Sequence, residues 1–173
     1  MSLTFFANDS PELKAMENGS HLLVIGTKAQ LELEAGNIPF HINMKMVGGS
    51  ATQLQPGVGP PLLYKIAKKL RPGSDSPATD ATYFEIDGTS VKVTLGCLPS
   101  AVASRHNAPS KPHAATDIVK GVASGEGTLR ILILLASADH AVALGTAVAR
   151  AFPLYSHKSS AAGVAPRKVS IFI

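Results

Sequence analysis

Residues 104–113, which read Ser-Arg-His-Asn-Ala-Pro-Ser-Lys-Pro-His from Ser104 to His113, concentrate side chains that can do chemistry. The segment places an arginine, two histidines, an asparagine, two hydroxyls and a lysine between two apolar stretches. A polar loop that follows a buried strand is a common position for an active site. Nucleophilic catalysis, metal binding and anion binding are the three chemistries that these residue types allow.

Nucleophilic catalysis would use Ser104 with His106. The chain, however, has no Gly-x-Ser-x-Gly sequence, and no carboxylate is placed to orient the histidine. Arg105 and Asn107 can instead satisfy backbone groups of a loop stiffened by its prolines. We therefore expect a structural loop and no catalytic residue. A small independent hydrolase that uses Ser104 or His106 is an alternative that peptide and ester substrates would test.

Metal binding would need donors at suitable spacing, and the six histidines do not provide it. No two of them lie three or four residues apart, and no paired-cysteine sequence occurs. His106, His113 and Asp117 could converge only if the loop folds back. The sequence predicts no metal-binding residue. The histidines are His21, His41, His106, His113, His140 and His157.

Anion binding would use a glycine-rich turn before a helix. Gly57-Val-Gly-Pro precedes a predicted helix, but it lacks the lysine and hydroxyl of a P-loop, and proline removes amides that would face a phosphate. Gly26-Thr-Lys is too short to count as such a motif. Both segments are predicted to be turns, and no cofactor-binding residue is expected.

Composition narrows the class of protein further. The chain has 173 residues, enough for one domain, and a net charge of +4. Lysines 65, 68 and 69 lie on one predicted helix and no aromatic residues interleave with them, so we expect a solvated face and not a nucleic-acid surface. The single cysteine, Cys97, is predicted to be a packed core thiol in a reducing compartment. No signal peptide or membrane span is expected, which favours the cytoplasm.

Hydrophobic patterns predict an α/β sandwich: a mixed β-sheet with helices on both faces. The strand at 21–27 is apolar on both faces and is predicted to be central, and Asp87-Gly88 predicts a hairpin. Residues 34–61 are predicted to be irregular, with one short strand around 40–46. A chain that ends within a strand pattern is expected to continue into a further domain. Strands are predicted at 3–7, 82–86, 90–98, 129–135 and from 168, and helices at 60–71, 112–123 and 138–152.

Two longer tracts carry a resemblance to a known family. The first is Leu-Gly-Cys-Leu-Pro-Ser-Ala-Val-Ala-Ser-Arg-His-Asn-Ala-Pro-Ser-Lys-Pro-His at 95–113. The second is Ala-Val-Ala-Arg-Ala-Phe-Pro-Leu-Tyr-Ser-His-Lys-Ser at 147–159, followed by Arg-Lys-Val-Ser-Ile-Phe at 167–172. Together they resemble the N-terminal domain of leucyl (cytosol) aminopeptidases, specifically the probable-aminopeptidase-like branch of animal proteins.

The resemblance implies that residues 1–173 form a single non-catalytic, macro-domain-like module of a larger enzyme. A C-terminal catalytic domain with two divalent ions, zinc or manganese, would follow it and remove N-terminal residues from peptides. The parent protein would be a cytoplasmic homohexamer, in which this domain supports assembly and access to the active site. The family's catalytic sequences are absent here, so no catalytic or metal-binding residue is carried over. The alternative is a free-standing macro-like module that binds ADP-ribose or a related nucleotide.

Overall fold

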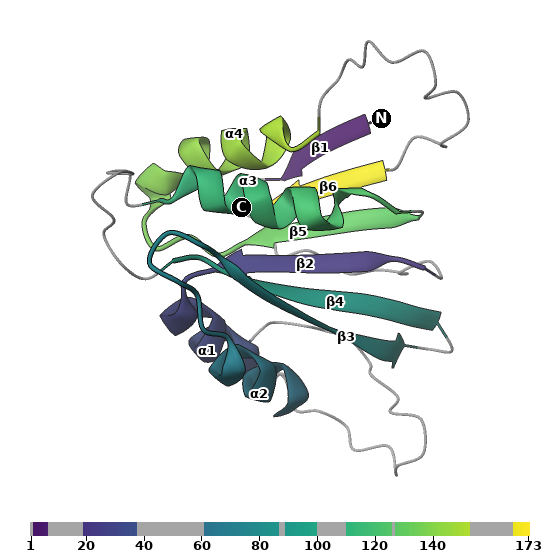
Figure 1. Ribbon diagram of the computed structural model, residues 1–173. Coiled ribbons are helices and arrows are strands. Elements are labelled where there is room, and N and C mark those ends of the chain that lie inside the picture. The colour runs from purple at the N-terminus through teal and green to yellow at the C-terminus, as the bar shows by residue number, and fades with distance from the viewer. Residues whose placement is uncertain are drawn as a thin grey trace.

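The computed structural model describes residues 2–6, 19–37, 61–86, 89–99, 110–125, 127–152 and 168–173. Strands and helices are mixed along these residues, as expected of an α/β domain (Figure 1). In chain order the elements are β1 (Ser2–Phe6), β2 (His21–Gly26), α1 (Lys28–Asn37), α2 (Pro61–Lys69), β3 (Ala78–Ile86), β4 (Thr89–Cys97), α3 (Pro112–Ala123), β5 (Thr128–Ile133), the 3-10 turn η1 (Ala138–His140), α4 (Ala141–Arg150) and β6 (Lys168–Phe172).

The strands form one mixed six-stranded sheet in the order β1-β6-β5-β2-β4-β3. β3 pairs antiparallel with β4, and the other four pairings are parallel. β2 is central, between β4 and β5, and all six of its residues are buried. The expected mixed sheet, the central strand and the antiparallel pairing across Asp87-Gly88 are therefore confirmed. The two turn residues themselves lie outside the described ranges.

Two helix layers enclose the sheet. α1 and α2 pack on one face, and α3 and α4 pack on the other (Figure 1). Alternate residues of β2 pack against the two layers. Leu22 and Val24 pack in the core beneath α1 and α2, whereas Leu23 and Ile25 pack in the core beneath α3 and α4. This arrangement explains why the strand is apolar at every position.

The helix α3 approaches the sheet closely at Gly96. A Cβ atom placed on Gly96 of β4 would lie 2.7 Å from Cγ2 of Ile118. A side chain at this position would force α3 away from the sheet, so the absence of a Cβ permits the close contact. α3 is fastened to its neighbour as well, since the Thr116 hydroxyl donates to the carbonyl of Ala147 in α4 at 2.8 Å.

The helix α1 was not expected. The sequence predicted irregular structure from residue 34, yet the chain is helical from Lys28 to Asn37. The predicted turn at Gly26-Thr-Lys is where β2 ends and this helix begins. Apolar periodicity gave no signal here because Leu31 is buried while Leu33 is 63% exposed. The predicted strand at 40–46 and the glycine turn at 57–60 lie outside the described residues.

Two strands also differ from the prediction. β3 begins at Ala78, four residues earlier than expected, because its ladder with β4 extends to the Ala78–Cys97 pair. Its first residues are polar because it is an edge strand with exposed positions, and this polarity resembles that of a loop. β5 was expected to be buried on both faces but is fully buried only on the side of Leu129, Ile131 and Ile133.

Candidate functional site

The parallel strands β2, β4, β5 and β6 end at one side of the sheet, called the carboxyl edge below. In open α/β sheets this edge is the usual place for ligands. Its described parts are the turn from β2 into α1, the exit from β4 through Leu98, and the entry to α3. The Leu98 amide donates to the Gly26 carbonyl at 2.9 Å, which joins the exit of β4 to the end of β2.

The polar segment 104–113 follows β4 in the chain, and its last two residues, Pro112 and His113, are the first two of α3. Residues 104–109, which include Ser104 and His106, lie outside the described ranges, and the structure describes the segment only from Ser110 onward. There Ser110 and Lys111 are both buried, with 5% and 6% of their surface exposed. Both residues are therefore packed against the domain just before α3 begins.

Lys111 has an uncommon backbone conformation, which the sequence did not reveal. Its φ of 49° and ψ of 50° are left-handed, a conformation that costs a residue with a Cβ about 1 kcal/mol or more. It is the N-cap of α3, and its carbonyl accepts from the amides of Ala114 and Ala115. Pro112 then occupies the first helical position, where its missing amide costs nothing. The helix start at Pro112 is as predicted.

A metal ion does not fit the described side chains. His113 and Asp117 lie one helical turn apart on α3, but His106 is outside the described ranges. Within the part of the chain that the structure describes, no group of three His, Cys, Asp or Glu side chains could hold a metal ion.

Cys97 is a buried thiol at the end of β4. It has no exposed surface, and its Sγ atom lies 3.7 Å from the Leu98 carbonyl oxygen. Burial raises the pKa of the thiol above its ordinary value, with a smaller opposing effect of Lys28. A raised pKa keeps the thiol protonated and poorly nucleophilic at neutral pH, so the prediction of a packed core thiol is confirmed.

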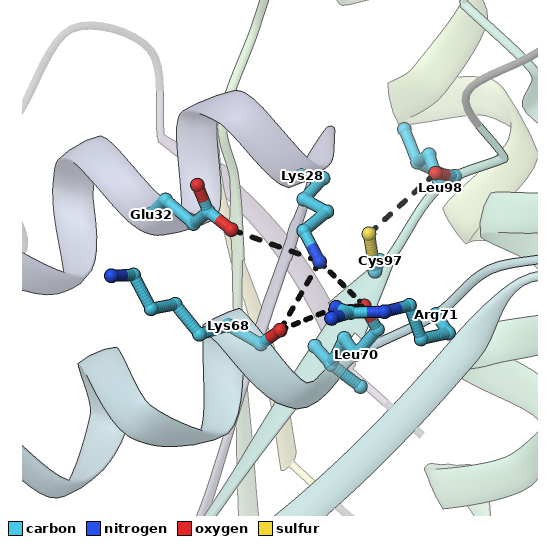
Figure 2. A network of polar contacts seen from close by, with 7 residues as sticks. All are labelled: Lys28, Glu32, Lys68, Leu70, Arg71, Cys97 and Leu98. Carbon is cyan, nitrogen blue, oxygen red and sulfur yellow. Dashed lines mark hydrogen bonds and ion pairs between the residues drawn. The ribbon is translucent and has the colours of Figure 1, made fainter.

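The best-defined polar network fastens α1 to the end of α2 (Figure 2). The Nζ atom of Lys28 donates to the carbonyl oxygens of Leu70 at 2.8 Å and of Lys68 at 3.2 Å. The guanidinium of Arg71 donates to the same two carbonyls, at 3.1 Å for that of Leu70. These carbonyls have no partner within the helix, and cations at a helix C-terminus also favour its dipole. The network is thus a two-cation helix cap.

The turn that presents Lys28 is itself built by a capping box. The Thr27 amide donates to Oε1 of Gln30 at 2.8 Å, and the Gln30 amide donates to the Thr27 hydroxyl at 3.4 Å. Thr-x-x-Gln is a sequence pattern that marks a helix start. It is the signal that could have revealed α1 and, with it, the position of Lys28.

The exposed side of α2 carries Leu62, Tyr64, Lys65, Lys68 and Lys69. The Nζ atom of Lys68 lies 4.7 Å from the centroid of the Tyr64 ring, and the pKa of this lysine is raised, chiefly by its interaction with Tyr64. The predicted solvated face is therefore present. Leu62 belongs to it as well, with 45% of its surface exposed.

The described helices include none long and apolar enough to pass through a membrane.

Comparison with known proteins identifies the family. The model of the M17 aminopeptidase N-terminal domain 2 matches residues 20–161, from just before β2 to beyond α4. The mouse (Mus musculus) protein named Probable aminopeptidase NPEPL1 is 39% identical over 75 residues, which are 43% of this chain and 14% of that protein. The human (Homo sapiens) protein of the same name is 38% identical over 68 residues, 39% of this chain and 13% of that protein.

A solved structure shows the same fold. The structure of leucyl aminopeptidase from Leishmania major in complex with actinonin matches with a TM-score of 0.66 and 18% identity. The match covers 98% of this chain and 28% of the Leishmania chain, so the shared part is about a quarter of that enzyme. The comparisons give no support to an ADP-ribose module. This chain belongs to the M17 aminopeptidase family and corresponds to an N-terminal domain of its leucyl aminopeptidases.

Proposed function

We propose that residues 1–173 are the single, non-catalytic N-terminal domain of a metal-dependent leucyl aminopeptidase. The observation that carries the proposal is the family match over residues 20–161, which includes all the described elements except β1 and β6. The catalytic domain, with two zinc or manganese ions, follows this domain in the same polypeptide. That domain removes N-terminal residues from peptides in the cytoplasm.

The domain supports assembly and access to the active site. Five of its described polar side chains hold the fold: Lys28 and Arg71 cap α2, Thr27 and Gln30 cap α1, and Thr116 joins α3 to α4. A rigid α/β unit of this kind suits a role as a spacer and contact surface in a hexamer. It holds neighbouring catalytic domains at fixed distances and limits which peptides reach them.

Deletion of residues 1–173 from the full-length enzyme tests this role. We expect light scattering to show a smaller assembly and kinetics to show an altered KM for tripeptides. Leucine p-nitroanilide, which is small, should be less affected. The matched control is full-length enzyme carrying Lys28→Arg, which keeps the cation that caps α2. An unchanged hexamer with unchanged KM values for both substrates would contradict the proposal.

A further inference from the structure

The positive charge of the chain is concentrated in one segment. Residues 35–74 contain Lys45, Lys65, Lys68, Lys69 and Arg71 and no Asp or Glu, a charge of +5. The whole chain has 16 cationic and 12 acidic residues, so the other positions together carry 11 − 12 = −1. The net charge of +4 therefore originates in this segment, and four of its five cations lie on or just after α2.

Three of these cations remain available on the surface of α2. Arg71 is engaged with the carbonyls at the end of the helix, whereas Lys65, Lys68 and Lys69 are exposed. The carboxylate of Glu32 acts on Lys68, but it also lies 3.7 Å from the Nζ atom of Lys28 and so is shared with another cation. The surface thus has an excess of positive charge.

The spacing of the exposed side chains forms two adjacent stripes along α2. Leu62, Lys65 and Lys69 recur at intervals of three and four residues, which places them along one side of the helix. Tyr64 and Lys68 form the second stripe, four residues apart. Each stripe combines a large apolar side chain, at least 40% exposed, with lysines. A partner with both acidic and apolar side chains would complement both features.

Phosphate-bearing partners fit this face less well. Arginine provides the bidentate fork that recognises phosphates, and the guanidinium of Arg71 is turned to the helix carbonyls. Stacking on a base needs a free aromatic face, and Lys68 occupies one face of the Tyr64 ring.

We propose that the exposed face of α2 (Leu62, Tyr64, Lys65, Lys68 and Lys69) docks an acidic, amphipathic helical segment of a partner protein. This surface goes beyond the proposed function and does not depend on it.

Fluorescence anisotropy with a labelled 21-residue helical peptide tests the proposal. The probe has leucines on one face and glutamates on both sides of them, and its matched control has glutamines in place of the glutamates. We expect the acidic peptide to bind the chain, and its affinity to fall at least about threefold between 50 and 300 mM NaCl because salt screens exposed charges. The glutamine peptide should bind more weakly than the acidic peptide.

Variants locate the binding face. Lys65→Glu with Lys69→Glu should lower the affinity about tenfold or more, and Leu62→Ser should also lower it, while circular dichroism shows a retained fold. The neutral pair Lys65→Gln with Lys69→Gln provides a second test if charge reversal disturbs α2. Lys120→Glu on α3 reverses one exposed charge elsewhere and should leave the affinity unchanged.

Three outcomes would overturn the proposal. The first is failure of the acidic peptide to bind. The second is binding that the α2 variants do not weaken, or that Lys120→Glu weakens equally. The third is tighter binding of a 12-base-pair DNA duplex or of phosphatidylserine vesicles than of the peptide, which would identify the face as a phosphate-binding surface.

Discussion

The Nζ atom of Lys28 donates a 2.8 Å hydrogen bond to the carbonyl oxygen of Leu70, and so joins the first residue of α1 to the residue that follows α2. The two residues are 42 positions apart in the chain. This bond and the parallel one to the Lys68 carbonyl make α1 and α2 a single layer over the sheet (Figure 2). Stability of that layer should therefore depend on a side chain at the carboxyl edge.

Lys28→Met should destabilise the chain by about 1–2 kcal/mol. The substitution keeps most of the aliphatic part of the side chain and removes the charged group that donates to two carbonyls at the end of α2. Hydrogen bonds of charged groups contribute about 1.5–3 kcal/mol, and partial exposure of the Lys28 side chain to solvent reduces that contribution. Urea unfolding followed by circular dichroism measures the change. Lys28→Arg is the control and should retain most of the stability. An unchanged urea midpoint in Lys28→Met would show that the cap contributes nothing.

Thr27→Ala should cost about 1 kcal/mol because it removes the hydroxyl of the capping box that starts α1. Thermal unfolding would show a lower midpoint. The matched control is Thr146→Ala, an exposed position within α4, where alanine is a better helix former than threonine. Equal effects of the two substitutions would contradict the capping role.

Gly96→Ala should destabilise the domain by about 1–3 kcal/mol, since the added methyl group would lie 2.7 Å from Ile118 in a packed core. Gly121→Ala is the control, and its expected effect on stability has the opposite sign. It lies within α3 with open space around the position of the new Cβ, and should stabilise the domain by about 0.5–1 kcal/mol. Denaturant titrations of both variants test the pair. If both variants lost a similar amount of stability, the close contact between position 96 and Ile118 could not be the cause.

The buried thiol of Cys97 should make the stability of the folded chain depend on pH in the alkaline range. Its pKa is raised in the folded state above the ordinary value of 9.0, so above that pH the unfolded chain loses the thiol proton first. The stability that this group contributes is complete below about pH 9 and falls as pH rises through the folded-state pKa. We expect a steeper alkaline loss of stability in the native chain than in Cys97→Ala, measured between pH 8 and 10. Parallel profiles would be inconsistent with a perturbed thiol.

The elements that the sequence predicts correctly are those whose capping residues and apolar patterns agree with their burial in the structure. α3 was predicted with the bounds observed, because Pro112 marks its start and Ser124-Gly125 its end. β2 was predicted to be central because it is apolar at every position. α1 was missed because its only fully buried described side chain is that of Leu31, and its formation depends on the Thr27–Gln30 cap and on contacts with α2.

The candidate site was predicted only in outline. The bounds of β4 and α3 agree with the predicted strand and helix on either side of the polar segment, and residues 104–109 of the segment lie outside the described ranges. The left-handed backbone of Lys111 could not be anticipated, since lysine is not a residue type that favours positive φ. The contact of Lys28 with Leu70 depends on the packing of two helices, and no local pattern encodes it. The exposure of the lysines of α2 was predicted from the sequence, but the contact of Lys68 with the Tyr64 ring was not.

The central claim is that this domain belongs to an aminopeptidase without performing the hydrolysis. Its most direct test is the rate of leucine release from a leucyl peptide, measured for the isolated 173-residue chain and for the full-length protein at equal concentrations with Mn²⁺ or Zn²⁺. We predict turnover by the full-length protein, loss of that turnover with a chelator, and no turnover by the isolated chain. Metal-dependent release of leucine by the isolated chain, or none by the full-length protein with either metal, would contradict the account.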